Sequence, residues 1–306
     1  MEKIEQISSS GYTAKINLTR GANCISLRND IHSANILREP DYTKPLDNEF
    51  IYGMPILFPP NRISDGKFEF DGRVYSFPIN DTGSNSHLHG ELYSKEFTLT
   101  EKTADKIVCE YTADQDNPYM DFPHNFKVEM TYTLSEDGLT QKIEIYNLSS
   151  AKMPALLGFH TTFNSVFAEG GLPENITVLA EFDEEYERNS KTYLPTGITL
   201  NPDDKSTALL YGKFNPFTSV SKHFRAEKKQ KLVIFDSKKG LSVVYEPDKK
   251  FKFRLIYNGD ASGYICLEPQ TCLTNCPNSP FDREYAGFDY ICPNESKIYT
   301  SKIYIK

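Results

Sequence analysis

Apolar and polar side chains alternate along much of this chain, and this period of two constrains the fold more than any other feature. Within Phe126–Leu134, apolar residues occupy five successive alternate positions. Successive side chains of a β-strand point to opposite faces, so the pattern predicts a strand with one buried face. Ser135–Gly138 then predicts a turn, and a return strand is expected over Leu139–Tyr146.

The segment Lys67–Phe77 carries a second strong signal, because two alternating runs are joined there by the dipeptide Asp71-Gly72. A two-residue type I′ turn needs a positive φ at both central positions, and this dipeptide tolerates it. We therefore predict a β-hairpin. Similar alternation or β-rich composition predicts further strands at Lys106–Ala113, Leu232–Phe235, Leu241–Tyr245, Phe251–Tyr257, Gly263–Leu267 and Lys297–Ile305.

The whole pattern favours the all-β class, with a large antiparallel β-sandwich as the architecture, because no window of helical length carries a convincing 3.6-residue stripe. A chain of 306 residues is long enough for one large all-β domain or for two smaller ones. No Gly/Ser-rich or Pro-rich linker and no fixed repeat divides it, so we expect a single domain over residues 1–306. Loops, where binding residues often lie, are expected at Glu39–Asn48, Thr112–His124, Phe182–Lys205 and Cys272–Tyr285.

The composition excludes several functional classes. The 34 basic and 42 acidic residues give a formal net charge of −8, which disfavours a nucleic-acid binder because such a protein needs a basic surface. The longest apolar runs, such as Met54–Phe58 and Met153–Phe159, are far too short to span a bilayer. Met1–Gln6 lacks the apolar core of a signal peptide, so we expect a cytoplasmic protein whose six cysteines are free thiols.

Four short segments place polar, ionisable groups inside otherwise apolar, strand-like sequence: Phe58–Arg62, Ser86–Gly90, Leu157–Asn164 and Ile265–Thr271. In the last two, His160 and Glu268 are single ionisable residues among apolar neighbours. Burying such a group costs roughly several kcal/mol unless it is paired or hydrogen-bonded, so these residues are candidates for a functional site. The alternative is that each is a satisfied residue of the core.

These segments, taken in order, resemble the aldose 1-epimerase (galactose mutarotase) family from about Gly11 to the C-terminus. The resemblance is carried by Asn61-Arg62 before the hairpin, Leu88-His89-Gly90, the run from Met153 to Asn164, and Cys266-Leu-Glu268-Pro-Gln-Thr271 with Asn275-Cys-Pro-Asn278 behind it. It implies a galactose-mutarotase-like β-sandwich, in agreement with the alternation.

The resemblance also implies an isomerase that interconverts the α and β anomers of a monosaccharide such as glucose or galactose. By this resemblance, His160 is the general acid that protonates the ring oxygen, and Glu268 is the general base that takes the proton of the anomeric hydroxyl. His89 would bind near the ring oxygen, and Arg62 would hold sugar hydroxyls. Ring opening needs an acid and a base together, and it requires no metal, nucleotide or redox cofactor.

The chain departs from the family pattern in three respects. Family members commonly carry a sugar-binding aspartate on a loop between the histidine and the glutamate, but Phe214–Arg225 contains no acidic residue. Thr161-Thr162 stand where the family more often has proline and an aromatic residue. The chain has no tryptophan, so any stacking on a sugar face must come from tyrosine or phenylalanine. These departures leave the acid–base pair intact and concern the choice of sugar.

The spacing of the histidines and cysteines does not predict a metal site. His87 and His89 would share one face of a strand, but two ligands leave a divalent ion under-coordinated, and the spacing to Glu91 does not fit a third. Four of the cysteines form no C-x-x-C pair, which argues against a structural zinc: Cys266, Cys272, Cys276 and Cys292.

Two alternative functions stay open. The basic run Lys222–Lys231 is either a solvated loop or a phosphate site that includes Arg225, and the latter would make the protein a hexose-6-phosphate mutarotase. The other alternative is a non-catalytic carbohydrate-binding protein on the same fold, although a binder needs no acid–base pair. We expect a small-molecule sugar as the partner, neither nucleic acid nor membrane, and a monomer or homodimer.

Overall fold

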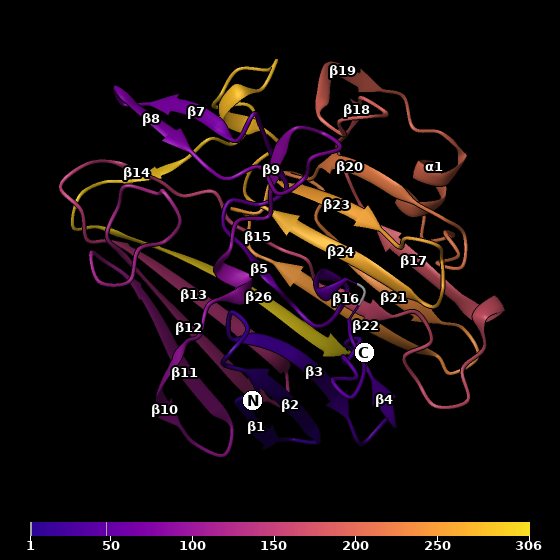
Figure 1. Cartoon of the computed structure of the whole chain (residues 1–306). Helices are drawn as coiled ribbons and strands as arrows, with labels where there is room; N and C mark the ends of the chain where they lie inside the picture. The colour runs from indigo at the N-terminus through magenta and orange to yellow at the C-terminus, as the bar shows by residue number, and fades with distance from the viewer. Residues whose placement is uncertain (1, 47) are drawn as a thin grey trace.

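The computed structural model describes residues 2–46 and 48–306. Met1 and Asp47 lie outside the described residues. Met1 is the first residue of the segment Met1–Gln6, and Asp47 is one position of the predicted loop Glu39–Asn48. The predicted all-β class is confirmed, because strands dominate and all pairings between the named strands are antiparallel. Two large sheets form the sandwich (Figure 1).

The first large sheet contains eight strands, and the C-terminal strand lies in its middle. In spatial order these are β10 (Thr98–Lys102), β11 (Lys106–Ala113), β12 (Phe126–Ser135), β13 (Gly138–Asn147), β26 (Ser296–Ile305), β22 (Leu241–Pro247), β21 (Leu232–Asp236) and β17 (Ile176–Ala180). The predicted strands over Phe126–Leu134 and Leu139–Tyr146 are confirmed as β12 and β13.

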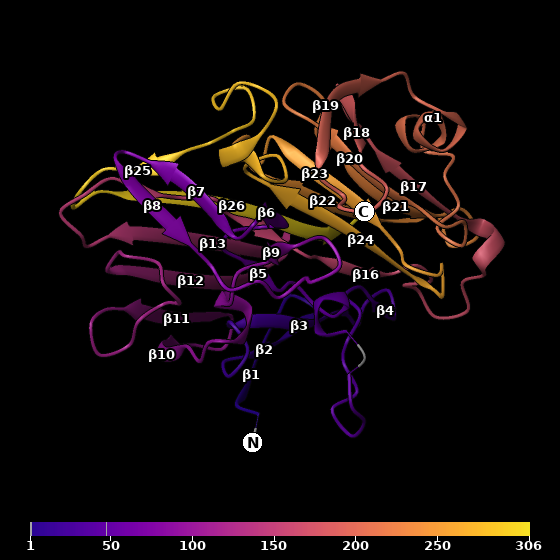
Figure 2. The same cartoon turned by 45° about the horizontal axis from the view of Figure 1, so that its top comes forward.

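The second large sheet carries the segments that the sequence singled out for chemistry. Its order is β19 (Pro195–Leu200), β18 (Glu184–Arg188), β20 (Ser221–Arg225), β23 (Phe253–Tyr257), β24 (Tyr264–Gln270), β15 (Gly158–Phe159) and β5 (Ile56–Leu57), and β16 (Thr162–Asn164) also pairs with β24. In Figures 1 and 2, β20, β23 and β24 run side by side beneath the β18–β19 hairpin.

Smaller sheets complete the fold around the sandwich. The N-terminal strands β1 (Ile4–Ser9), β2 (Tyr12–Asn17), β3 (Asn23–Asn29) and β4 (Ala34–Asn35) form a sheet at the bottom of Figure 1. Three strand pairs follow: β6 (Arg62–Ser64) with β9 (Ser86–Leu88), β7 (Lys67–Phe70) with β8 (Arg73–Ser76), and β14 (Met153–Pro154) with β25 (Tyr290–Ile291). Single 3₁₀ turns are η1 (Glu49–Ile51), η2 (Leu92–Ser94), η3 (Pro173–Asn175) and η4 (Cys276–Asn278).

The hairpin predicted over Lys67–Phe77 is confirmed as β7 and β8. Its central residues Asp71 and Gly72 have φ values of 51° and 73°, as a type I′ turn requires. The strand that leads into the turn places Phe68 against Tyr75, with stacked rings whose centroids are 4.6 Å apart. The hairpin is thereby fixed by its turn and by an aromatic pair across the strands.

The core follows from the alternation. Along β12, every second residue is buried, and the register sets Met130 opposite Ile143 and Val128 opposite Ile145 of β13. Burying an aliphatic side chain of this size stabilises the fold by roughly 1.5 to 3 kcal/mol. The same face joins the main apolar cluster, to which Ile265 and Leu267 of β24 also belong.

The prediction of an uninterrupted loop over Phe182–Lys205 is wrong, because this segment contains β18 and β19 and reaches the helix α1 (Asp204–Leu210). The sequence shows no 3.6-residue stripe of helical length, and it therefore did not predict these seven helical residues. The helix is too short for periodicity to show, and Asp203 caps it by accepting a hydrogen bond of 2.9 Å from the Ser206 backbone N–H. No helix among the described residues combines the length and the apolar character needed to cross a membrane.

Candidate active site

Strand β24 places Glu268 at the centre of the second large sheet. All seven of its residues are buried, so both faces of the strand are covered. Ile265 and Leu267 face the apolar core, and by the period of two Glu268 points to the opposite side. Its side chain is only 1% exposed, which makes it a buried carboxyl group on the non-core face of a central strand.

His160 directly follows β15, the neighbour of β24. The β15 segment is paired on both sides, with Gly158 opposite Gln270 of β24 and opposite Leu57 of β5. The His160 backbone N–H donates a 3.0 Å hydrogen bond to the Pro55 carbonyl. The pairing therefore fixes the backbone that carries the imidazole.

The two side chains meet. His160 Nε2 lies 3.3 Å from Glu268 Oε1, and the other carboxyl oxygen of Glu268 accepts a 3.4 Å contact from the Gln270 amide. The His160 Nδ1 atom has no hydrogen-bond partner among the described residues. The acid and base candidates are thus direct neighbours on one side of the sheet.

Burial shifts both groups in the direction of their neutral forms. It lowers the pKa of His160 to about 4 and raises the pKa of Glu268 to about 8, and the rise for Glu268 is opposed by the Arg188 charge, the Gln270 hydrogen bond and the Arg62 charge. Between these two values the pair holds one proton. A buried pair that shares one proton titrates as a unit.

Arg62 and His89 are brought to the same site by the pairing of β6 with β9. The His89 backbone N–H donates to the Asn61 carbonyl at 2.9 Å, and the Asn61 backbone N–H donates to His89 Nδ1 at 3.2 Å. Burial, with the His160 and Arg62 charges, holds the pKa of His89 well below 6.5, so the ring is neutral. Since Nδ1 accepts, the proton sits on Nε2, which is free to donate.

The backbone at His89 has a φ of 69°, in the left-handed region, which costs a residue with a side chain about 1 kcal/mol or more. The following Gly90 has a φ of 66°, and a Cβ there would overlap the Phe58 carbonyl. The reciprocal hydrogen bonds with Asn61 hold His89 in this conformation. The Leu88-His89-Gly90 motif therefore forms a turn that directs the His89 imidazole into the cleft.

Arg62 is fixed by a protein carboxylate. Its Nε donates to Asp81 Oδ2 at 2.8 Å, and its guanidinium carbon lies 4.7 Å from the ring centroid of Tyr193. Burial alone would raise the pKa of Asp81, but hydrogen bonds from Ser84 and Arg62 outweigh it and lower that pKa. The Arg62 charge thus already has a counter-ion.

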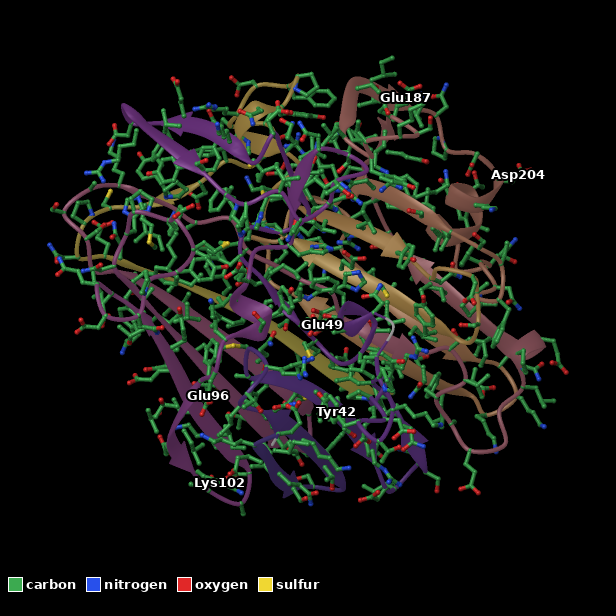
Figure 3. The ribbon with its side chains drawn as sticks, viewed as in Figure 1. Tyr42, Glu49, Glu96, Lys102, Glu187 and Asp204 are labelled. Atoms are coloured by element: carbon green, nitrogen blue, oxygen red, sulfur yellow. The ribbon has the colours of Figure 1, made fainter. Side chains whose placement is uncertain are left out.

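A cleft of about 350 Å³ collects all four residues that the sequence predicted, namely Arg62, His89, His160 and Glu268. Its other lining residues are Asn48, Phe50, Asn61, Leu88, Arg188, Tyr193, Ser221, Leu255 and Tyr257. Phe50, Tyr193 and Tyr257 are the aromatic side chains among them. Figure 3 marks Glu49 and Glu187, which precede two of the lining residues in the chain, Phe50 and Arg188.

Arg188 is the residue of the cleft that sequence analysis missed. It ends β18, and its Nη2 donates to the Ser221 carbonyl at 2.6 Å and to the Ser221 hydroxyl at 2.9 Å. The strand has the sequence Glu-Glu-Tyr-Glu-Arg and lies next to the edge strand of the sheet. It therefore lacks the alternation of apolar residues from which a strand could be predicted. The one sequence feature that could have indicated a role for Arg188 is its basic side chain within the predicted loop Phe182–Lys205.

The basic run Lys222–Lys231 does not supply the cleft with a phosphate site. Arg225 is absent from the cleft, pairs with Glu227 at 2.5 Å, and has its guanidinium carbon 4.2 Å from the Tyr285 ring centroid. Lys222 Nζ lies 2.5 Å from Glu185 and 2.9 Å from Asp203, outside the lining of the cleft. Lys222 and Arg225 neutralise protein carboxylates, and no residue of the run is among those that line the cleft, so the run brings no phosphate-binding cation into it.

The residues weighed as metal ligands are placed differently from one another. His87 Nδ1 lies 2.7 Å from the Pro78 carbonyl oxygen, and its ring stacks on Phe77, so it joins no ligand cluster among the described residues. By contrast, one ligand atom each from His160, Cys266 and Glu268 lie within 4.8 Å of one another. A metal ion bound there would occupy the atoms that the sequence assigns to the acid and the base.

Comparison with known proteins gives a family match over nearly the whole chain. Residues 3–298 match the family described as aldose 1-epimerase. The chain is 31% identical to a galactose mutarotase-like protein from Clostridium acetobutylicum, whose crystal structure superposes with a TM-score of 0.92 over 100% of this chain and 98% of that one.

A more distant structural similarity shows the fold alone. A putative aldose 1-epimerase from Escherichia coli K12 is 16% identical with a TM-score of 0.80, covering 100% of this chain and 99% of that one. Among curated proteins, the uncharacterized protein YihR of Escherichia coli (strain K12) is 27% identical over 119 residues. That alignment spans 38% of each of the two proteins.

Proposed function

The chain belongs to the aldose 1-epimerase family, and from this premise we propose that it is an isomerase that interconverts the α and β anomers of a monosaccharide such as glucose or galactose. The single observation that carries the proposal is the contact of 3.3 Å between His160 Nε2 and Glu268 Oε1 inside a cleft large enough for a hexose. The ring oxygen and the anomeric hydroxyl of an aldose are bonded to the same carbon. Neighbouring acid and base groups can therefore each reach one of these oxygens.

The proposed reaction moves one proton onto the substrate and one off it. The Glu268 carboxylate takes the proton of the anomeric hydroxyl while the His160 imidazolium gives a proton to the ring oxygen. The bond between the anomeric carbon and the ring oxygen breaks, and the electron pair of the O–H bond forms the aldehyde. Rotation about the C1–C2 bond presents the other face, and the reverse transfers close the ring as the opposite anomer.

The shared proton makes this cycle reversible without any outside donor. The reactive form has the proton on His160, and the neutral form, which burial favours, has it on Glu268. Both forms carry the same total charge, so one proton transfer within the pair connects them. Each positioned acid or base typically contributes about 10²–10⁴-fold to the rate.

The other two predicted residues bind the sugar in this proposal. His89 Nε2–H is oriented by its Nδ1 contact with Asn61, and it donates a hydrogen bond near the ring oxygen. Arg62, held by Asp81, donates to sugar hydroxyls. The rings of Phe50, Tyr193 and Tyr257 supply apolar surface for the C–H face of a pyranose.

The experiment follows optical rotation, or the anomeric proton signals in NMR, after α-glucose or α-galactose is dissolved. We expect the wild-type protein to accelerate equilibration, and we expect His160→Ala and Glu268→Gln each to lose about 10²–10⁴-fold of that acceleration. Glu185→Gln is the matched control, because Glu185 is also a buried carboxylate but lies outside the cleft.

A non-catalytic sugar binder gives a different result. It would bind these sugars, seen as broadened sugar signals, while the anomers equilibrated at the spontaneous rate with wild type and variants alike.

We further propose that the protein is a monomer or homodimer, and light scattering on the same samples tests this. A cytoplasmic location is likewise proposed, and fractionation of cells checks it.

A further inference from the structure

The charges that line the cleft do not balance. Its lining residues include two guanidinium groups, Arg62 and Arg188, and a single carboxyl group, Glu268. Arg62 is neutralised by Asp81 at 2.8 Å. Among the residues that the structure describes, no carboxylate oxygen lies within 4.0 Å of a nitrogen of Arg188.

Glu268 does not fill this role. It makes no ion pair with Arg188, and its proton is retained by burial up to about pH 8, the value to which its pKa is raised. Burial and the nearby Arg62 charge lower the pKa of Arg188, as expected for a cation that lacks a counter-ion. The cleft therefore carries one uncompensated positive charge at neutral pH.

Arg188 is held in place with donors to spare. Its two hydrogen bonds to Ser221 both use Nη2, so Nε and Nη1 donate to no acceptor among the described residues. A guanidinium presents its N–H groups in a planar fork that matches the oxygens of a carboxylate, a phosphate or a sulfur oxyanion. A fixed, half-buried fork with free donors suits a charged oxygen group on a ligand.

We propose that Arg188 binds an oxyanion substituent of the sugar, so that the cleft prefers an anionic monosaccharide, carrying a carboxylate, phosphate or sulfur oxyanion, over its neutral counterpart. This inference rests on the proposed function and names its class of substrate. In this proposal the acid and base exchange protons with the two oxygens on the anomeric carbon, and Arg188 binds a charged substituent elsewhere on the same sugar.

The cleft has space for such a substituent beside Arg188. Arg188, Tyr193 and Ser221 also line a neighbouring cleft of about 520 Å³, so this side of the site is open. In that second cleft Lys222 pairs with Glu185, whereas Lys205 donates to the Ser219 carbonyl and lies outside the lining of the first cleft. Arg188 is the cation that lines both clefts.

The experiment compares four sugars by exchange NMR at anomeric equilibrium: glucose, glucuronate, glucose 6-phosphate and glucose 6-sulfate. The readout is the ratio of kcat/KM for each anionic sugar to that for glucose. We expect at least one ratio above about 10 in the wild type. The loss of a charge-assisted hydrogen bond in Arg188→Gln should lower that ratio by about 10- to 100-fold.

The controls separate recognition from general damage. Arg188→Lys keeps a positive charge without the fork, so its ratio should fall between those of wild type and Arg188→Gln. Arg225→Gln removes an arginine that lies outside the cleft, and its ratio should equal that of the wild type. The three anionic sugars show which oxyanion is preferred.

The outcomes for the two proposals are distinguishable. If glucose is equilibrated faster but every ratio stays near 1, or does not respond to Arg188→Gln, the role of Arg188 is overturned and the isomerase stands. If no sugar is equilibrated faster, the isomerase falls, and line broadening of the same four sugars decides the role of Arg188. Tighter binding of an anionic sugar that is lost in Arg188→Gln supports it, and equal or absent binding overturns it.

Discussion

Two central strands, β12 in the first large sheet and β24 in the second, use burial in opposite ways. Strand β12 buries every second residue, and its other face is partly exposed. Strand β24 is buried at all seven positions, because one face packs on the apolar core and the other forms part of the cleft. The buried face of β12 is apolar throughout, whereas β24 buries Glu268 and Gln270.

The difference separates buried residues that raise the free energy of unfolding from a buried residue that lowers it. On β12, each buried side chain contributes transfer free energy and packing. On β24, Glu268 loses its hydration and finds no ion pair with Arg62 or Arg188, so its burial costs stability. We interpret this cost as the price of a reactive site, and substitutions on the two strands should reveal it with opposite signs.

The largest expected effect is on β12. Met130→Ala removes a fully buried side chain opposite Ile143 and leaves a cavity, so we expect the free energy of unfolding to fall by about 2 to 5 kcal/mol. Urea denaturation measures the change. The folded fraction should keep its rate of anomer exchange, and a lost rate with an unchanged unfolding midpoint would reverse the roles given to the two strands.

A smaller effect of opposite sign is expected on β24. Glu268 has a pKa of about 8 when folded against an ordinary 4.5, so at pH 7 folding must retain a proton that the unfolded chain releases. Glu268→Gln removes this penalty and should raise the free energy of unfolding by about 1 to 3 kcal/mol at pH 7.

The pH dependence of that gain checks its cause. The stabilising contribution of a group whose pKa is raised on folding is complete below 4.5 and is lost as the pH rises towards 8. The advantage of Glu268→Gln in urea denaturation should therefore shrink to nearly zero at pH 4 and grow up to pH 8. A gain that is independent of pH would point to better packing instead.

The smallest effect is expected on the outer face of β12. Thr131 is only partly buried and lies between Glu129 and Thr133 on the face that does not meet the core. Thr131→Ser should change the free energy of unfolding by less than about 0.5 kcal/mol. A loss comparable to that of Met130→Ala, measured in the same denaturation series, would show that this face is covered in solution.

The contrast also explains how far the sequence could predict the molecule. The apolar period of two along β12 and the Asp71-Gly72 turn identify strands and a hairpin, because local side-chain chemistry decides both. Glu268 and His160 were conspicuous as isolated ionisable residues in apolar runs. Their contact joins residues 108 positions apart (268 − 160) and depends on the order of strands in the sheet, which no local pattern encodes.

Arg188 shows what local patterns cannot reveal. Its strand, β18, is polar and lies beside the edge strand β19, so the sequence suggested a loop. The basic run at Lys222–Lys231 was more conspicuous, yet Lys222 and Arg225 are paired with protein carboxylates. Whether a cation is free for a ligand depends on its neighbours in space, and the sequence does not specify those neighbours.

The dependence of kcat/KM for anomer exchange on pH tests most directly whether a buried pair sharing one proton opens the ring. Both groups are protonated below about pH 4 and both are deprotonated above about pH 8, so the pair has a base and an acid together only between these values. We predict a plateau between pH 4 and 8 that falls on both sides, measured with glucose or the preferred sugar. A profile governed by one titration near 6.5, the ordinary value of histidine, would contradict the account.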